Sequence, residues 1–270
     1  AINGPYIKIQ DAVDALPTIL TGHSCVVIKD GANYAEQVTV RNFVNNGSTI
    51  TIFADPASGF RPTVSPPALS TAAFQIVNAS VNIQGIYIRA NQSIPYGIVT
   101  SSAYVSISSV VITTSGSLGI YEAVVRISSW STISNSSVTV WGAHGFWLDS
   151  STKTTISYST AVNKSGSGAP LYYPVFLSAG NASNTFTVLF ASNSHATGTG
   201  MRMASSSTNT ITLSTIRGGD TGVWLNTGAI YTTISLSTMV GSATIGLSLQ
   251  GASSNTVNGS YMESGFYGAY

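Results

Sequence analysis

The sequence predicts an all-β fold: a single-stranded, right-handed parallel β-helix of about ten coils with a short N-terminal capping helix. The first observation is a short sequence motif, an apolar residue flanked by Ser, Thr or Asn, which recurs from about residue 81 onwards. Its anchors are 23 to 26 residues apart, with one step of 30, and such a fixed period is typical of a solenoid. The anchors are Ile83, Ile107, Ile133, Ile156, Phe186, Ile211, Ile234 and Val257.

A second motif in each repeat predicts another strand. Apolar residues alternate with other residues there, so the local period is two, which indicates a strand and not a helix. The residues between the inward positions then form one outward column. This column reads Val99, Arg126, Trp147, Phe176, Arg202, Trp224 and Ser248. Ser, Thr and Asn fill the turns, where they suit tight bends and can stack on their equivalents in the next coil.

The N-terminal residues follow a different pattern. Ile9, Val13 and Leu16 have the spacing of an amphipathic helix, and Pro17 ends it. A helix at this position covers the open edge of the first coil. We therefore expect a single domain over residues 1–270, with a cap at 1–24 and coils over 25–270.

Two segments near the N-terminus resemble a known superfamily. Residues 9–15, IQDAVDA, and residues 26–38, VVIKDGANYAEQV, are similar to the opening of pectin methylesterases and related pectate-lyase-like β-helix proteins. The resemblance implies a capped, right-handed parallel β-helix. The active-site motifs of pectin methylesterases and the paired-aspartate motifs of polygalacturonases have no counterpart in this sequence. The resemblance therefore concerns the fold and carries no activity with it.

Two irregular stretches interrupt the repeats. The first lies near residues 55–70 and contains four prolines, and the second covers residues 163–174. Because the repeated motif resumes in register after each irregular stretch, we interpret both stretches as insertions within one domain. Insertions in solenoids tend to lie on one face and often bind something.

Candidate catalytic residues are few. The chain has nine acidic residues, and no outward column places two of them in adjacent coils. We therefore predict no metal site and no cofactor, since calcium sites and acid–base pairs need clustered carboxylates. His195 and Asp220 each follow an anchor by nine residues, so they are a weak candidate pair, although two polar turn residues in local contact is the favoured interpretation. Asp149, near His144 and Lys153, is the other weak candidate.

The outward column is the stronger candidate for a contact surface. Arg126, Trp147, Phe176, Arg202 and Trp224 are predicted to form a ladder on one face, joined by Tyr172 and Tyr173 from the second irregular stretch. An Arg over an aromatic ring is favourable by ~0.5–2 kcal/mol, and an exposed aromatic row often marks a contact surface. It would stack on sugar rings or on another copy of the chain. Self-stacking that only stabilises the sheet, or cover by residues 163–174, is the alternative.

Charge and composition exclude several classes of partner. The net charge is +1 and only 7% of residues are charged, so nucleic-acid binding is not expected. No apolar run approaches the ~18 residues of a membrane span, and the lone Cys25 is expected in the core. The low-charge, Ser/Thr-rich composition favours a secreted or cell-surface protein. Possible N-glycosylation sites are Asn46, Asn78, Asn91, Asn135, Asn163, Asn181 and Asn258.

These observations favour one functional hypothesis over two others. The leading hypothesis is a non-catalytic extracellular structural protein, a surface or filament subunit with an adhesive role. Its expected partners are surface glycans or other copies of itself, joined laterally or head to tail, because no second capping helix follows the final coil. The alternatives are a carbohydrate-active enzyme, a lyase or esterase on polysaccharide, and a glycan-binding module that uses Trp147 and Trp224.

Overall fold

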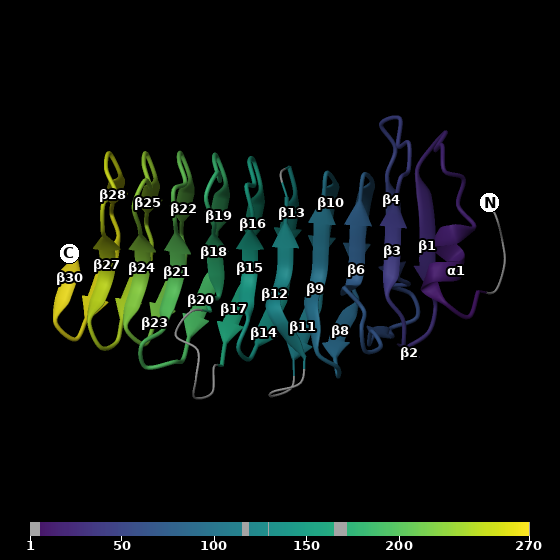
Figure 1. The fold of residues 1–270 in the computed structure, drawn as a ribbon, viewed down its shortest axis with the longest axis horizontal. Helices are drawn as coiled ribbons and strands as arrows, with labels where there is room; N and C mark the ends of the chain where they lie inside the picture. Colours follow the sequence, from purple (N-terminus) through teal and green to yellow (C-terminus); the bar gives the residue numbers. More distant parts are fainter. Residues whose placement is uncertain (1–5, 115–118, 129, 165–171, 270) are drawn as a thin grey trace.

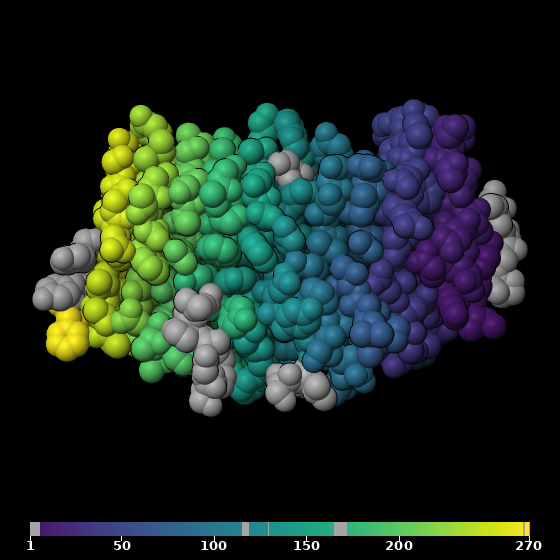
Figure 2. Space-filling view, viewed as in Figure 1, coloured from purple at the N-terminus to yellow at the C-terminus, as the bar shows by residue number. Residues whose placement is uncertain are grey.

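The computed structural model describes residues 6–114, 119–128, 130–164 and 172–269. These residues form thirty strands and one helix, wound into an elongated rod of stacked coils (Figure 1). Each coil contributes one strand to each of three sheets, and each sheet contains ten parallel strands. Figure 2 shows the coils packed side by side as one uninterrupted body. The predicted all-β, right-handed parallel β-helix of about ten coils is confirmed.

The three sheets take every third strand in chain order. The first sheet contains β1 (Ser24–Ile28), β4 (Ile50–Ala54), β7 (Ser80–Gln84), β10 (Tyr104–Ser108), β13 (Thr132–Ser134), β16 (Thr155–Ser157), β19 (Thr185–Thr187), β22 (Thr210–Thr212), β25 (Thr233–Ser235) and β28 (Thr256–Asn258). The second sheet contains β2 (Asn33–Tyr34), β5 (Thr63–Val64), β8 (Tyr87–Ala90), β11 (Val111–Thr114), β14 (Ser137–Val140), β17 (Thr160–Asn163), β20 (Phe190–Asn193), β23 (Thr215–Gly218), β26 (Thr238–Gly241) and β29 (Tyr261–Ser264). The third sheet contains β3 (Val38–Arg41), β6 (Ala72–Val77), β9 (Ile94–Ser101), β12 (Ile120–Ile127), β15 (His144–Leu148), β18 (Val175–Leu177), β21 (Thr199–Met203), β24 (Thr221–Leu225), β27 (Ile245–Leu249) and β30 (Tyr267–Ala269).

Side chains that point into the coils form one continuous core, which runs from Ile9 to Leu247. The anchors from Ile83 to Ile234 are at most 1% exposed, whereas Val257 is 36% exposed. Burying a side chain of this size contributes roughly 1.5–3 kcal/mol. The second sheet supplies a further inward column that the sequence analysis did not identify. It consists of Ile88, Ile112, Val138, Ala161, Ala191, Ile216 and Met239.

Helix α1 (Ile9–Asp14) covers the first coil, as predicted. Ile9 and Val13 are buried, and Leu16 packs partly buried against the same core. The carboxylate of Glu36 accepts the backbone N–H of Ile9 at 2.8 Å and that of Gln10 at 3.0 Å. These bonds satisfy two of the free N–H groups at the helix start, where the helix dipole also favours a negative charge.

The side chain of Gln10 pairs with the first strand of the third sheet. Strand β3 has a neighbour on one side only, β6. The Oε1 atom of Gln10 accepts the Thr39 N–H at 2.6 Å, and its Nε2 donates to the Thr39 carbonyl at 3.1 Å. The carboxamide therefore binds Thr39 as a neighbouring strand would. Because an unpaired edge is a template for another chain, the cap protects this edge by specific hydrogen bonds as well as by cover.

The corner between the first and second sheets repeats one backbone conformation. The second residue after each anchor has a positive φ, a region that disfavours bulky and β-branched residues. These residues are Gly85, Ser109, Asn135, Tyr158, Val188, Leu213, Leu236 and Gly259. Buried serines follow several of the bends and link the coils, as when the Ser214 N–H donates to Ser237 Oγ at 3.2 Å. Asn184 and Asn209 are linked in the same way before the anchors, through an N–H to Oδ1 bond of 3.0 Å.

The first irregular stretch differs from the expected insertion. Its residues 63–64 form β5, which pairs with β2 and β8. Val64 is fully buried, so the stretch is a coil with long turns around a short strand. In the second stretch, residues 165–171 lie outside the described residues. Asn163 ends β17, and Tyr172 and Tyr173 precede β18.

The expected burial of Cys25 is wrong. Cys25 is exposed on β1, whereas its neighbour Val26 is 6% exposed and Ile28 is 4% exposed. Side chains alternate between the two faces of a strand. Since Val26 and Ile28 take the inward positions, Cys25 and Val27 must face outward.

Candidate functional site

The outward column of the third sheet brings together the five residues of the predicted ladder. Parallel pairing of β12, β15, β18, β21 and β24 sets each of them beside the next. Their chain neighbours point into the core, as Phe146 and Leu148 do on β15. All five are partly exposed. We call this set the Arg/aromatic ladder: Arg126, Trp147, Phe176, Arg202 and Trp224.

Guanidinium groups and rings hold the ladder together. The Arg126 guanidinium lies 4.9 Å from the centroid of the Trp147 ring, and that of Arg202 lies 4.7 Å from the Trp224 ring. Between them, the rings of Trp147 and Phe176 are 5.9 Å apart. Each Arg–ring contact contributes about 0.5–2 kcal/mol. Ladder neighbours therefore cover much of the ring faces, and self-stacking is part of what these residues do.

Three further rings pack beside the ladder. The His144 ring stacks on Phe176 at 4.8 Å and on Tyr173 at 5.5 Å, and Tyr172 meets its edge at 5.4 Å. The Nδ1 atom of His144 accepts the Tyr173 N–H at 3.1 Å, which requires a ring unprotonated at that nitrogen. Burial, together with the positive charge of Arg202, lowers the pKa of His144 to about 4. The imidazole is therefore neutral near pH 7.

The two carboxylates of this face are engaged by ladder residues and their neighbours. Asp149 forms an ion pair with Arg126 and accepts the Ser178 hydroxyl at 2.9 Å. Burial alone would raise the pKa of Asp149, but the hydrogen bonds from Arg126 and Ser178 hold this pKa below its ordinary value. The hydroxyl of Tyr96 donates to Glu122 and accepts an N–H of Arg126 at 2.9 Å. Burial and the bond to Glu122 raise the pKa of Tyr96, so its hydroxyl stays protonated at neutral pH.

Arg202 differs from Arg126 in its partners. Its Nη1 donates to the Tyr173 hydroxyl at 3.0 Å, and no carboxylate of the described residues forms an ion pair with it. Its Nε has no hydrogen-bond partner within the described part of the chain, and the indole Nε1 atoms of Trp147 and Trp224 likewise have none. The ladder therefore holds three buried donors without an acceptor. Buried donors of this kind are uncommon and call for an explanation.

The side chains of the weak catalytic candidates make separate contacts, although the turns that carry His195 and Asp220 meet, with the Asp220 N–H donating to the Gly198 carbonyl at 3.0 Å. His195 Nδ1 contacts its own turn, at 3.2 Å from the Thr197 N–H, whereas the Asp220 carboxylate accepts the hydroxyls of Thr221 and Thr244. The Lys153 ammonium lies 4.0 Å from the Trp130 ring centroid, and it forms no ion pair with Asp149. Over the described ranges, no three His, Cys, Asp or Glu side chains gather closely enough to hold a metal ion. No helix there has the length and apolar character needed to cross a membrane.

Two of the seven predicted glycosylation sites are closed off in the folded protein. Asn163 is 0% exposed and its Nδ2 donates to the Ala143 carbonyl at 3.1 Å. Asn181 is 1% exposed and its Nδ2 donates to the Leu148 carbonyl at 2.9 Å. Both amides hold coils together, so attachment of a glycan there would require unfolding. The other five lie exposed on turns or strand ends: Asn46, Asn78, Asn91, Asn135 and Asn258.

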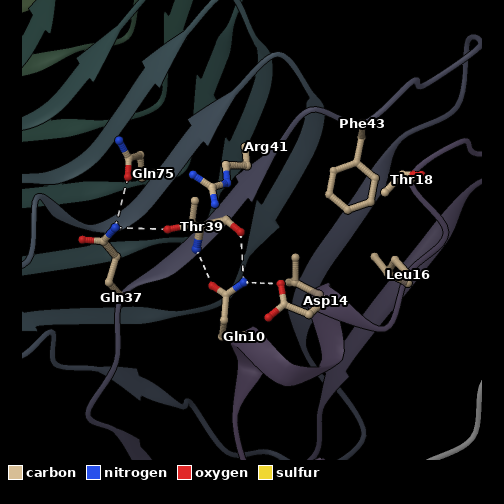
Figure 3. A pocket seen from close by; sticks show the side chains of 10 residues that line it. Gln10, Asp14, Leu16, Thr18, Gln37, Thr39, Arg41, Phe43 and Gln75 are labelled. Carbon is tan, nitrogen blue, oxygen red and sulfur yellow. Dashed lines mark hydrogen bonds between the residues drawn. The ribbon is translucent and has the colours of Figure 1, made fainter.

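A groove of about 520 Å³ lies at the N-terminal end of the third sheet, between the cap and the first coils (Figure 3). The Nε2 atom of Gln37 donates to Thr39 Oγ1 and to Gln75 Oε1, both at 3.0 Å. The helix, two strands and a turn contribute to the groove, so no single sequence motif announces it. It is lined by Gln10, Val13, Asp14, Leu16, Thr18, Gln37, Thr39, Arg41, Phe43 and Gln75.

Comparison with known proteins identifies the fold and no closer relationship. A scan against protein-family models gave no match, and a search of the curated proteins found no matching relative. Among solved structures, the enzymatically active domain of tailspike protein 2 from bacteriophage CBA120 is 13% identical with a TM-score of 0.57, covering 98% of this chain and 41% of that one. The full-length tailspike protein 2 of an Escherichia coli O157:H7 bacteriophage is 13% identical with a TM-score of 0.54, covering 96% and 35%. The A-module of mannuronan C-5 epimerase AlgE6 from Azotobacter vinelandii is 12% identical with a TM-score of 0.49, covering 97% and 93%.

The class of protein follows from the sheet topology and these matches together. The chain is a right-handed parallel β-helix with the fold of the tailspike structures. It spans less than half of the length of the tailspike chains that it matches. At 13% identity the likeness shows the fold alone, because one fold hosts many functions.

Proposed function

We propose that this chain is a non-catalytic protein of the cell exterior that contacts glycans through the Arg/aromatic ladder. The observation that carries the proposal is the set of unpartnered donors on Trp147, Arg202 and Trp224. Leaving such a group without a partner costs about 1–3 kcal/mol. Hydroxyl or carboxylate oxygens of a sugar would accept from these donors after a small movement of the side chains.

The chemistry of the ladder suits a sugar better than an apolar partner. Glycans present closely spaced oxygens beside apolar C–H groups, and the ladder alternates N–H donors with ring edges. Trp and Tyr side chains combine an apolar body with a polar group that needs a partner when buried. Arg202 adds a positive charge that no described carboxylate neutralises through an ion pair.

The proposal is non-catalytic because the candidate acids and bases of this face are occupied. Asp149 is paired with Arg126, and Glu122 accepts the Tyr96 hydroxyl. The raised pKa of Tyr96 opposes its use as a base at neutral pH. General acid–base chemistry needs a group poised to exchange its proton near the working pH. The carbohydrate-active enzyme remains the alternative that the experiment must exclude.

The test is glycan binding by the purified chain and by ladder variants. On a glycan array, followed by calorimetry with the best ligand, Trp224→Ala and Arg202→Ala should each weaken binding several-fold. Trp141→Ala is the matched control, because Trp141 is an exposed tryptophan outside the ladder, and it should bind as the unaltered chain does. Equal binding by all variants would contradict the assigned surface. Release of shorter sugars from any bound polysaccharide would contradict the non-catalytic role.

A second candidate function, lateral association of copies, has an observation of its own. Tyr158, Leu213 and Leu236 lie in one corner column and are 64%, 55% and 62% exposed. An exposed apolar row flanked by uncharged residues is a contact surface for a like row. Light scattering and negative-stain microscopy should show paired or fibrous rods, and Leu213→Ser with Leu236→Ser should reduce them. A strictly monomeric chain at high concentration would end this candidate.

A further inference from the structure

We infer that the outer face of the first sheet, from β13 to β28, is an ice-binding surface. It is built from the residues on either side of each recurring anchor. One column contains threonine in six successive coils, and the column beside it contains Ser, Thr or Asn. We call this set the threonine face: Thr132, Thr155, Thr185, Thr210, Thr233, Thr256, Ser134, Ser157, Thr187, Thr212, Ser235 and Asn258.

The two columns form a regular grid. The five successive strand pairings from β13 to β28 keep the same register, with no shift or bulge. Side chains therefore repeat about every 4.8 Å from coil to coil and about every 6.6 Å along each strand. The coils stack side by side along the rod (Figure 1), so the two columns run along its length. A regular two-dimensional array of this kind fits best a partner with a similar repeat.

The chemistry of the threonine face is uniform. None of the twelve residues is charged, and all of them are partly or fully exposed. Threonine is stiff about χ1, so a column of threonines holds its hydroxyl and methyl groups with little rotamer freedom to lose. Among the described residues, the hydrogen bond from Ser235 Oγ to Thr212 Oγ1, at 3.1 Å, is the one recorded between two side chains of this face. The hydroxyls are therefore largely available to water.

The face fits a crystal of water better than a single sugar or peptide. It has no ring on which a sugar could stack, no charge, and none of the unpartnered buried donors that mark the ladder. Each hydroxyl binds weakly, so useful affinity requires many equal contacts made at once. One repeat of the oxygen atoms on the prism faces of hexagonal ice is close to the coil-to-coil spacing of the grid. This surface lies on a different sheet from the Arg/aromatic ladder, so it stands independently of the glycan proposal.

The test is partition of the purified chain into slowly growing ice, together with thermal hysteresis in a nanolitre osmometer. We expect the unaltered chain to be enriched in the ice fraction and to hold back crystal growth. Thr210→Lys, in the middle of the face, should abolish most of both effects because it adds bulk and hydration to the grid. Thr215→Lys is the matched control, since Thr215 lies in the same coil and is also partly exposed, but on the second sheet. It should behave as the unaltered chain does.

The outcomes separate this surface from the alternatives. Thermal melting by circular dichroism checks that both lysine variants fold, and Thr210→Val, which keeps the shape but removes one hydroxyl, gives a milder version of the same test. Exclusion of the unaltered chain from ice would overturn the inference. Equal loss in Thr210→Lys and Thr215→Lys would also overturn it, since the effect would then not belong to this face. Binding to crystalline cellulose or chitin without binding to ice would reassign the face to a periodic polysaccharide.

Discussion

At its N-terminal end the outer surface of the third sheet carries an amide network, and five coils in its middle carry the Arg/aromatic ladder. In the network, Gln37 Oε1 accepts the Thr71 N–H at 2.8 Å, and its Nε2 reaches Thr39 and Gln75. Gln10 is likewise engaged through both of its amide atoms. The ladder, by contrast, leaves three buried donors without an acceptor. The network is fully explained by the need to close the first coil, whereas the ladder retains hydrogen-bonding capacity that the fold does not use.

The largest effect is expected where the network meets the cap. Glu36→Ala removes a buried carboxylate that accepts two helix N–H groups, and hydrogen bonds to a charged group contribute about 1.5–3 kcal/mol each. We expect the free energy of unfolding to fall by about 4 kcal/mol, measured by urea denaturation. Asp11→Ala is the control, because Asp11 is an exposed carboxylate of the same helix. A similar small loss in both variants would mean that the cap does not depend on Glu36.

The His144 ring, which packs beside the ladder, should give a pH dependence that the amide network lacks. The pKa of His144 falls from its ordinary 6.5 to about 4 in the folded chain, so the unfolded chain binds the extra proton first. Stability is therefore complete above pH 6.5 and falls by up to about 3 kcal/mol as the pH drops towards 4. Melting curves between pH 7 and 4 should show this loss, and His144→Gln should flatten it. His23→Gln, which alters an exposed histidine, should keep the unaltered slope; equal slopes in all three proteins would refute the assignment.

A smaller effect separates two positions of the outward column. Gln75→Ala removes the acceptor of the Gln37 amide and should lower the free energy of unfolding by about 1 kcal/mol. Ser248 occupies the same column beyond the ladder, beside Trp224. Ser248→Ala should change stability little in the same denaturation experiment, because the nearly buried Ser248 side chain has no hydrogen bond within the described part of the chain to lose. If Ser248→Ala proved the more damaging change, the contrast between network and ladder would be misplaced.

The smallest effect concerns the one ion pair of the ladder. The Arg126 and Asp149 side chains are 33% and 31% exposed, so solvent screens much of their attraction. A double-mutant cycle with Arg126→Ala and Asp149→Ala should give a coupling energy of about 0.5 kcal/mol. A coupling several times larger would show that the pair is a main support of the ladder, and that it is not free to rearrange around a ligand.

Much of the fold could be predicted from the sequence because every coil repeats the same spacing and alternation of apolar residues. The spacing of Ile133, Ile156 and Ile211 fixes a coil length, and alternation around Trp147 and Trp224 fixes which side chains face outward. The ladder followed directly, since a parallel register sets equivalent positions side by side. The second sheet was harder to find, because its inward column includes small residues such as Ala161 and Ala191, which carry no strong apolar signal.

The remainder of the site depends on contacts between distant segments. His144 reaches Tyr173 and Phe176 across one coil, and no local pattern reveals that its ring is enclosed. The role of Glu36 is hidden for the same reason, because its partners lie 26 and 27 residues away. Asn163 shows the converse error, since a surface glycosylation pattern there coincides with a buried amide that a neighbouring coil requires.

The unbroken register from β22 to β28 has a consequence for how such a chain can change in length. Ile211, Ile234 and Val257 follow one another at equal intervals, and their strands pair without a shift. Deleting residues 211–233 would join Thr210 to Ile234 and restore the same local sequence motif, Asn-Thr-Ile-Ser. The rod would then shorten by one step of about 4.8 Å, and Arg202 would lie beside Ser248 where it now lies beside Trp224. The length of the rod therefore changes in whole coils, by duplication or loss of one repeat at a time.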